Sequence, residues 1–78
     1  MSYAVRIMCR PEVAAGFLLA GLAPVEAGTP DDAARQLGTL LEHPETGVVL
    51  IEDTLYQGLP EDLQRRLARR ALPIVVPL

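Results

Sequence analysis

The 78-residue chain contains no lysine and no tryptophan, and its single serine, cysteine and histidine are Ser2, Cys9 and His43. All seven basic residues are therefore arginines. Without lysine, the chain cannot supply a P-loop lysine, a Schiff base or the lysine of a phosphoryl-receiver site. A single cysteine cannot form an internal disulfide, and one cysteine with one histidine cannot build a Cys/His zinc site. These absences exclude several common enzyme classes.

Aromatic residues are also few, since Tyr3, Phe17 and Tyr56 are the complete set. Half of the residues are hydrophobic, so the core of this single small domain must be built from Leu, Val, Ile and Ala. The net charge of −3 and the pI near 4.9 argue against a nucleic-acid partner. Neither a dinucleotide-binding Gly-x-Gly-x-x-Gly motif nor a Gly-x-Ser-x-Gly elbow occurs. We therefore expect no cofactor and no catalytic residue.

The strongest positive feature is the run from Val13 to Val25, thirteen residues without a charge or a polar side chain. It predicts a helix ended by Gly21 and Pro24, but a surface helix normally keeps a polar face. The run is too short to cross a bilayer, which needs about 20 apolar residues. Another chain or a further segment is expected to cover it, and this points to a piece of an assembly. The N-terminus lacks a signal-peptide layout, so we expect a cytoplasmic protein.

Strand and helix patterns alternate along the rest of the chain. Four apolar runs predict strands, at residues 3–9, 23–27, 47–51 and 72–77. Three segments predict helices, from Pro11 to about Gly21, from a Thr29 cap to His43, and from Pro60 to about Ala71. This alternation indicates α/β structure with parallel strands and right-handed crossovers.

The economical arrangement is a doubly wound, flavodoxin-like sheet of four parallel strands in the order 2-1-3-4, with three helices. The first helix then covers one face of the sheet, and the second and third helices cover the other. A complete fold of this type places another helix beside the first one. We therefore expect one face of the sheet to be incompletely covered.

The segment Glu12-x-x-x-Gly16-Phe17-x-Leu19-Ala20-Gly21-Leu22 resembles the F subunit of the V-type/A-type rotary ATPases. Three later parts agree with that family: the helix from Thr29 to Leu41, the strand and acids from Gly47 to Asp53, and the Leu-Pro-Ile-Val-x-Pro run of 72–77. The resemblance spans essentially the whole chain. The chain departs from it at Cys9-Arg10, where family members commonly carry Asp.

The resemblance implies a non-catalytic rotor subunit that acts by protein–protein contact. The F subunit lies with the D subunit in the central stalk, where it helps couple ATP turnover to ion transport. It is peripheral to the membrane and is not inserted in it. Residues 1–78 would form one domain, the N-terminal domain of the family, without the C-terminal helical segment that the family carries.

Two groups of residues are candidates for partner contacts. Val13, Phe17 and Ala20 are expected on the outer side of the uncharged helix, and Tyr56 in the connection after the third strand. Arg66 and Arg70 belong to a basic cluster on the third helix that could dock on an acidic surface. The alternative for this cluster is a solvated face with Glu61–Arg65 and Asp62–Arg66 pairs, spaced i,i+4.

A third candidate group is polar. Arg10, Glu52 and Asp53 follow the first and third strands, at the edge where open α/β sheets bind ligands. They could form a small polar pocket or a weak Mg²⁺ site, and the plainer alternative is one ion pair at a solvated strand end. A degenerate receiver-like signalling or small-ligand domain that uses this edge is therefore the alternative function. Self-association through the uncharged helix is a further possibility.

Overall fold

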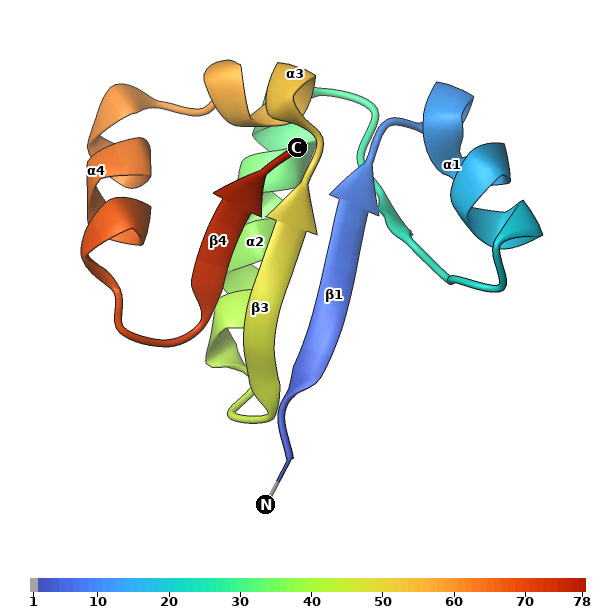
Figure 1. Ribbon diagram of the computed structural model, residues 1–78. Coiled ribbons are helices and arrows are strands. Elements are labelled where there is room, and N and C mark those ends of the chain that lie inside the picture. Colours follow the sequence, from blue (N-terminus) through green and yellow to red (C-terminus); the bar gives the residue numbers. More distant parts are fainter. Residues whose placement is uncertain (1) are drawn as a thin grey trace.

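The computed structural model describes residues 2–78 (Figure 1). The elements follow in the order β1 (Ala4–Cys9), α1 (Pro11–Leu19), β2 (Val25–Glu26), α2 (Pro30–Glu42), β3 (Thr46–Ile51), α3 (Asp53–Gln57), α4 (Glu61–Arg69) and β4 (Ile74–Pro77). The four strands form one parallel sheet in the order β2-β1-β3-β4. The α/β class and the strand order predicted from the sequence are thus confirmed.

The helix ends follow from local sequence. Pro30 occupies the first turn of α2, and the Thr29 hydroxyl accepts a 3.1 Å hydrogen bond from the Asp32 N–H, as an N-cap should. At the end of α1, Gly21 adopts a positive φ of 84°. The Leu22 N–H then donates to the Phe17 carbonyl oxygen at 2.9 Å, and the Gly21 N–H donates to that of Leu18 at 3.0 Å. This double closure is a Schellman motif, and glycine adopts the required left-handed conformation without steric cost.

A short helix, α3, lies where the sequence predicted only a connection. It covers five residues, and its Leu55 is buried while Tyr56 packs against the core. A helix of little more than one turn has too few residues to show a helical period of apolar side chains, so the sequence pattern does not indicate it. The structure therefore has four helices within residues 2–78, where three were expected.

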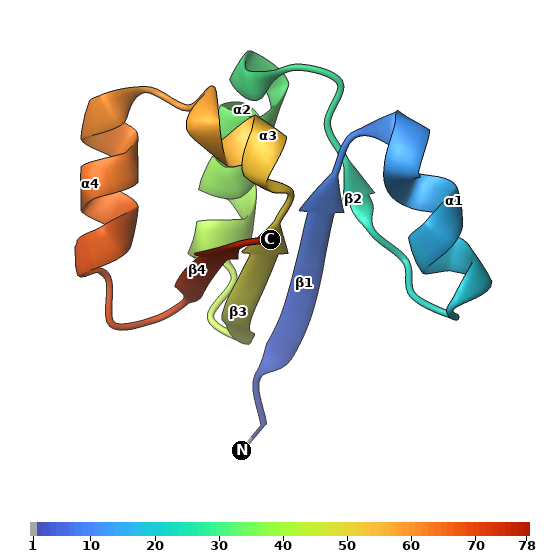
Figure 2. The ribbon, with the colours of Figure 1, turned by 45° about the horizontal axis from the view of Figure 1, so that its top comes forward.

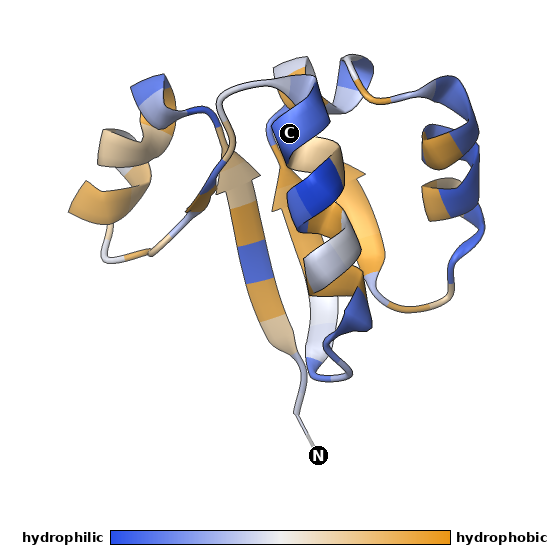
Figure 3. Ribbon diagram, turned by 180° about the vertical axis from the view of Figure 1, so that it is seen from behind, coloured by the Kyte–Doolittle hydropathy of each residue, from blue (hydrophilic) through white to orange (hydrophobic). Residues whose placement is uncertain are grey.

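The core lies on one face of the sheet. Met8, Val49 and Ile51 point from the strands toward the α2 side, where Ala33 and Leu37 of α2 meet them. Leu55, Leu59 and Leu67 close this core from α3, the following turn and α4. Figure 3 shows α2 across this face, with α4 beside it turning its apolar side inward and its polar side outward. The α2 side is thus the well-packed layer of the molecule.

The opposite face carries a second set of aliphatic side chains. Side chains alternate between the two faces along a strand, and partners in register share a face. The register pairs Val5 with Val48 and Val48 with Ile74 in one row, and Ile7 with Leu50 and Leu50 with Val76 in the next. None of these six residues belongs to the core cluster, and Val5 and Ile74 are 60% and 49% exposed. Figure 1 looks onto this face and shows no helix in front of β1, β3 and β4.

Helix α1 covers less of this face than the sequence predicted. Only Ala14 of α1 is buried, and no α1 residue belongs to the core cluster. Figure 2 shows α1 beside the β2 edge of the sheet, with α4 at the opposite edge. The expectation that one face would be incompletely covered is therefore met.

Candidate functional site

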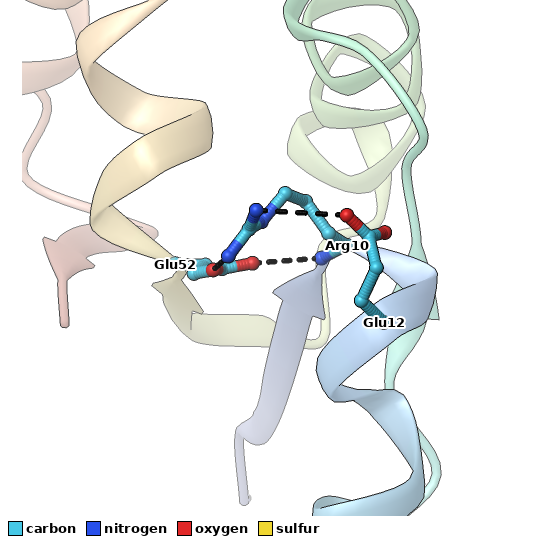
Figure 4. A network of polar contacts seen from close by, with 3 residues as sticks. All are labelled: Arg10, Glu12 and Glu52. Atoms are coloured by element: carbon cyan, nitrogen blue, oxygen red, sulfur yellow. Dashed lines mark hydrogen bonds and ion pairs between the residues drawn. The ribbon is translucent and has the colours of Figure 1, made fainter.

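The polar edge of the sheet is organised around one ion pair (Figure 4). Arg10 follows β1 and Glu52 follows β3, and the two strands are hydrogen-bonded neighbours. The Arg10 side chain donates to Oε2 of Glu52 from Nε at 2.9 Å and from Nη2 at 2.6 Å. The Arg10 backbone N–H donates to Oε1 of the same carboxylate at 2.9 Å. A third residue, Glu12, lies at the rim with Oε2 3.5 Å from Nη1 of Arg10.

These contacts shift the pKa values of two groups at this edge, Glu52 and Cys9. The hydrogen bond from Arg10, more than any other contact, holds the pKa of Glu52 below its ordinary value, although partial burial opposes this. The neighbouring Cys9 thiol is fully buried, and this burial raises its pKa, with the Glu52 and Glu26 carboxylates adding to the effect. A buried thiol held in its neutral form behaves as a small hydrophobic side chain. His43 lies at the other end of the sheet, before β3, and pairs with Glu45.

Asp53 does not join the pair. Asp53 is exposed, and its Oδ1 accepts a 3.2 Å hydrogen bond from Gln57, one turn later in α3. Within residues 2–78 no group of three or more His, Cys, Asp or Glu side chains is placed to hold a metal ion. Of the three predicted residues, the structure therefore brings Arg10 and Glu52 together and leaves Asp53 apart. The arrangement is a closed ion pair in the position where related folds open a ligand site.

The pair predicts an acid-dependent contribution to stability. A carboxyl whose pKa is lowered by folding stabilises the fold above its ordinary pKa of about 4.3, and this stabilisation is lost as the pH falls through the lowered value. We expect Glu52→Gln to make the fall in the urea midpoint between pH 7 and pH 3 smaller than in the unsubstituted chain. Some fall will remain, because the hydrogen bond from Arg35 also lowers the pKa of Asp32.

Arg10→Gln is the matched test, since the hydrogen bond from Arg10 is the main cause of the lowered pKa of Glu52. It should reduce the fall of the urea midpoint between pH 7 and pH 3 in the same way. The double variant with Glu52→Gln should show no further reduction. An unchanged pH profile in Glu52→Gln would contradict this account of the pair.

The residues proposed for partner contact on α1 differ in exposure, and their role as contacts stays a prediction. Val13 and Phe17 are half-buried, and Ala20 is exposed at the C-cap. Leu18 and Leu19 of α1 are more exposed, at 55% and 90%, and Leu22, beyond the end of the helix, is 44% exposed. Ala14 is the one buried residue of α1, so its side of the helix is the most covered one. An apolar sequence without a polar face gave no means of predicting which side this would be.

The other candidate contacts lie on the α2 side or at the edge of α4. Tyr56 is half-buried and packs against the core, and its role as a partner contact stays a prediction. Arg66 is exposed with Nη2 3.8 Å from Asp62, and Arg65 lies 3.7 Å from Glu61, so both predicted i,i+4 pairs are present. Arg70 is exposed at the C-cap of α4 and has no ion pair within residues 2–78. The role of these arginines as a docking surface stays a prediction.

The fold and these features together define a class of protein. It is a small doubly wound α/β domain whose strand-end edge is filled by its own ion pair, and whose exposed aliphatic side chains gather on one side of the sheet. No helix within residues 2–78 is long and apolar enough to span a bilayer.

Comparison with known proteins identifies the family. The model of the ATP synthase (F/14-kDa) subunit family matches residues 5–78, and the chain belongs to this family. The V-type ATP synthase F subunits of two Thermus thermophilus strains are 31% identical over 72 residues, which is 92% of this chain and 69% of the relatives. The resemblance drawn from the sequence is thereby confirmed.

A solved structure supports the fold. The crystal structure of the V-type ATP synthase F subunit from Archaeoglobus fulgidus superimposes with a TM-score of 0.82 at 23% identity, covering 100% of this chain and 99% of the other. Family membership favours the rotary-ATPase interpretation over the receiver-like alternative.

Proposed function

We propose that this chain is a non-catalytic central-stalk component of a V/A-type rotary ATPase, coupling ATP turnover to ion transport through protein–protein contacts. The observation that carries the proposal is the family match over nearly the whole chain, from residue 5 to residue 78. The relatives that match are themselves F subunits of V-type ATP synthases. In this role the chain hydrolyses nothing and is held at the membrane only through the complex.

The structure agrees with a role that depends on contact. The Arg10 and Glu52 side chains are hydrogen-bonded to each other, which favours a structural role for the pair over a role in binding a substrate. The exposed aliphatic residues of α1 offer surface for a partner instead. We propose the D subunit as the partner and residues 1–78 as one domain of the F-subunit type.

Binding to a purified D-subunit homologue from the same organism tests the proposal. We expect a saturable complex by isothermal titration calorimetry, with the negative heat-capacity change that burial of apolar surface produces. Arg66→Glu and Arg70→Glu test whether the basic cluster contributes, and Arg35→Glu on α2 serves as the charge-matched control. The absence of binding by the chain, while the F subunit of a related complex binds its own D subunit under identical conditions, would contradict the proposal.

A further inference from the structure

Helix α1 has little packing of its own. Ala14 is its one buried residue, and no α1 residue belongs to the core cluster or to the partly buried side chains packed against that cluster. The other three helices each contribute a buried leucine to the cluster: Leu37, Leu55 and Leu67. Segments with few buried apolar contacts open at a lower free energy than the rest of a protein. The position of α1 must therefore depend on other contacts.

Glu52 offers a fixed point beside α1. Its backbone N–H donates to the carbonyl oxygen of Met8 at 2.9 Å, which ties it to β1. Its carbonyl oxygen accepts from the N–H groups of Leu55 and Tyr56 at 3.0 and 3.1 Å, as the N-cap residue of α3 does. Leu55 is in turn buried in the core cluster. The Glu52 backbone is thus held by both the sheet and α3.

Arg10 connects α1 to this fixed point. It is the N-cap residue of α1, and its carbonyl oxygen accepts from the Val13 N–H at 3.1 Å. The Glu52 carboxylate accepts three hydrogen bonds from Arg10 at 2.6 to 2.9 Å, one from the backbone N–H and two from the guanidinium group (Figure 4). Hydrogen bonds between charged groups are about twice as strong as neutral ones. The bond to the backbone fixes the point at which the helix leaves the sheet.

The burial of Cys9 shows what α1 covers. Side chains alternate along β1, so Cys9 lies on the same side of the sheet as Val5 and Ile7, away from the core cluster. Val5 is 60% exposed, whereas Cys9 is fully buried. Within residues 2–78 the only other buried hydrophobic residue outside the core cluster is Ala14 of α1. Since α1 begins two residues after Cys9, the α1 segment supplies the cover of the thiol.

We infer that the Arg10–Glu52 pair positions α1, and that α1 separates from the sheet as one unit when the pair is broken, uncovering Cys9 while the core cluster stays packed. After α1 the chain is next held by β2, whose two residues pair with Met8 and Cys9. The pair thereby also sets the position of the candidate contact residues Val13, Phe17 and Ala20. This inference goes beyond the proposed function and does not depend on it.

The reactivity of Cys9 measures this opening, because Cys9 is the only cysteine of the chain. A buried thiol reacts with dithionitrobenzoate only when the structure opens around it. Opening of α1 alone exposes little surface, so labelling should depend only weakly on urea below the unfolding transition. We expect Arg10→Gln and Glu52→Gln each to speed this labelling about tenfold or more, the factor that loss of a hydrogen bond to a charged group gives. The double variant should label no faster than the faster single variant.

The two variants differ in their effect on the thiol itself, which separates opening from a change of pKa. The Glu52 carboxylate adds to the raised pKa of Cys9, so Glu52→Gln also makes the thiol intrinsically more reactive at a fixed pH. Arg10→Gln keeps that carboxylate and can speed labelling only through opening. Asp53→Asn is the matched control and should leave the rate unchanged, because Asp53 is an exposed acid that bonds Gln57 instead of Arg10.

Amide hydrogen exchange gives a second measurement on the unsubstituted chain. The N–H groups of Phe17 and Leu18 should exchange with a weak dependence on urea, and that of the buried Leu37 with the full dependence of global unfolding. Labelling of Cys9 with the full urea dependence, or faster labelling in Glu52→Gln but not in Arg10→Gln, would overturn the inference. A chain whose α1 never opens alone but which still binds the D-subunit homologue would overturn it too, and would leave the proposed function standing.

Discussion

Replacing Leu37 by alanine is expected to lower the free energy of unfolding by about 2–5 kcal/mol, because it leaves a cavity in the centre of the core. Leu37 of α2 is fully buried and belongs to the cluster formed with Met8, Val49 and Ile51 of the sheet. This layer is the well-packed side of the molecule, since Met8, Leu37, Val49 and Ile51 are all fully buried in it. For a domain of this size the loss corresponds to a fall in melting temperature of about 4–8 °C per kcal/mol.

Urea unfolding followed by far-UV circular dichroism measures this change. Thr39→Ala on the same helix is the control, because Thr39 is exposed and a surface substitution is expected to change the stability by less than about 0.5 kcal/mol. Should Leu37→Ala unfold with a midpoint close to that of Thr39→Ala, the α2 layer would not be the main core of the domain.

Much of this architecture could be predicted from the sequence, because the signals were local and strong. The Thr29 cap, Pro30 and the two following aspartates start a helix whatever surrounds them, and the cap bond is present. The continuous apolar run of residues 47–51 indicated a central parallel strand, and β3 lies between β1 and β4. Alternation of strands and helices then left few topologies, and the order 2-1-3-4 followed from right-handed crossovers.

The orientation of α1 could not be predicted, and the reason is physical. A helix turns its more apolar side inward, and the stretch from Val13 to Leu19 offers no polar side to turn outward. The choice of the inner side then depended on fit, and the small Ala14 side chain is buried while Leu18 and Leu19 are exposed. Tertiary packing decided what periodicity could not.

At the polar edge, the sequence placed Arg10, Glu52 and Asp53 together but could not rank the two acids. Two consecutive residues at the end of a strand point in different directions. Glu52 is the N-cap residue of α3 and meets Arg10 across the sheet edge, whereas Asp53 enters the helix and bonds Gln57. The short helix α3, which had no signal in the sequence, is thus the element that separates them.

A second large effect on stability is expected from a substitution at Gly58, the glycine that follows α3. Gly58 has φ −84° and ψ −5°, a conformation that alanine adopts readily, so the backbone itself does not require glycine here. Space does, because a Cβ at this position would collide with Cγ of Pro30, and would also lie 2.8 Å from Cβ of that proline. Pro30 forms the first turn of α2 and has a rigid ring, so it cannot rotate away.

Gly58→Ala is therefore expected to destabilise the domain by about 1–3 kcal/mol, as overpacking does at a close contact. Gly38→Ala is the matched control within α2. Nothing lies within 4 Å of a Cβ added there, so it should stabilise the domain by about 0.4–1 kcal/mol through helix propensity and unfolded-state entropy. Opposite shifts of the urea midpoint from one and the same substitution would show that α3 and the start of α2 meet at Gly58. If both variants shifted the midpoint upward, the close approach of Pro30 to Gly58 would be wrong, and the placement of α3 that separates Glu52 from Asp53 would lose its anchor.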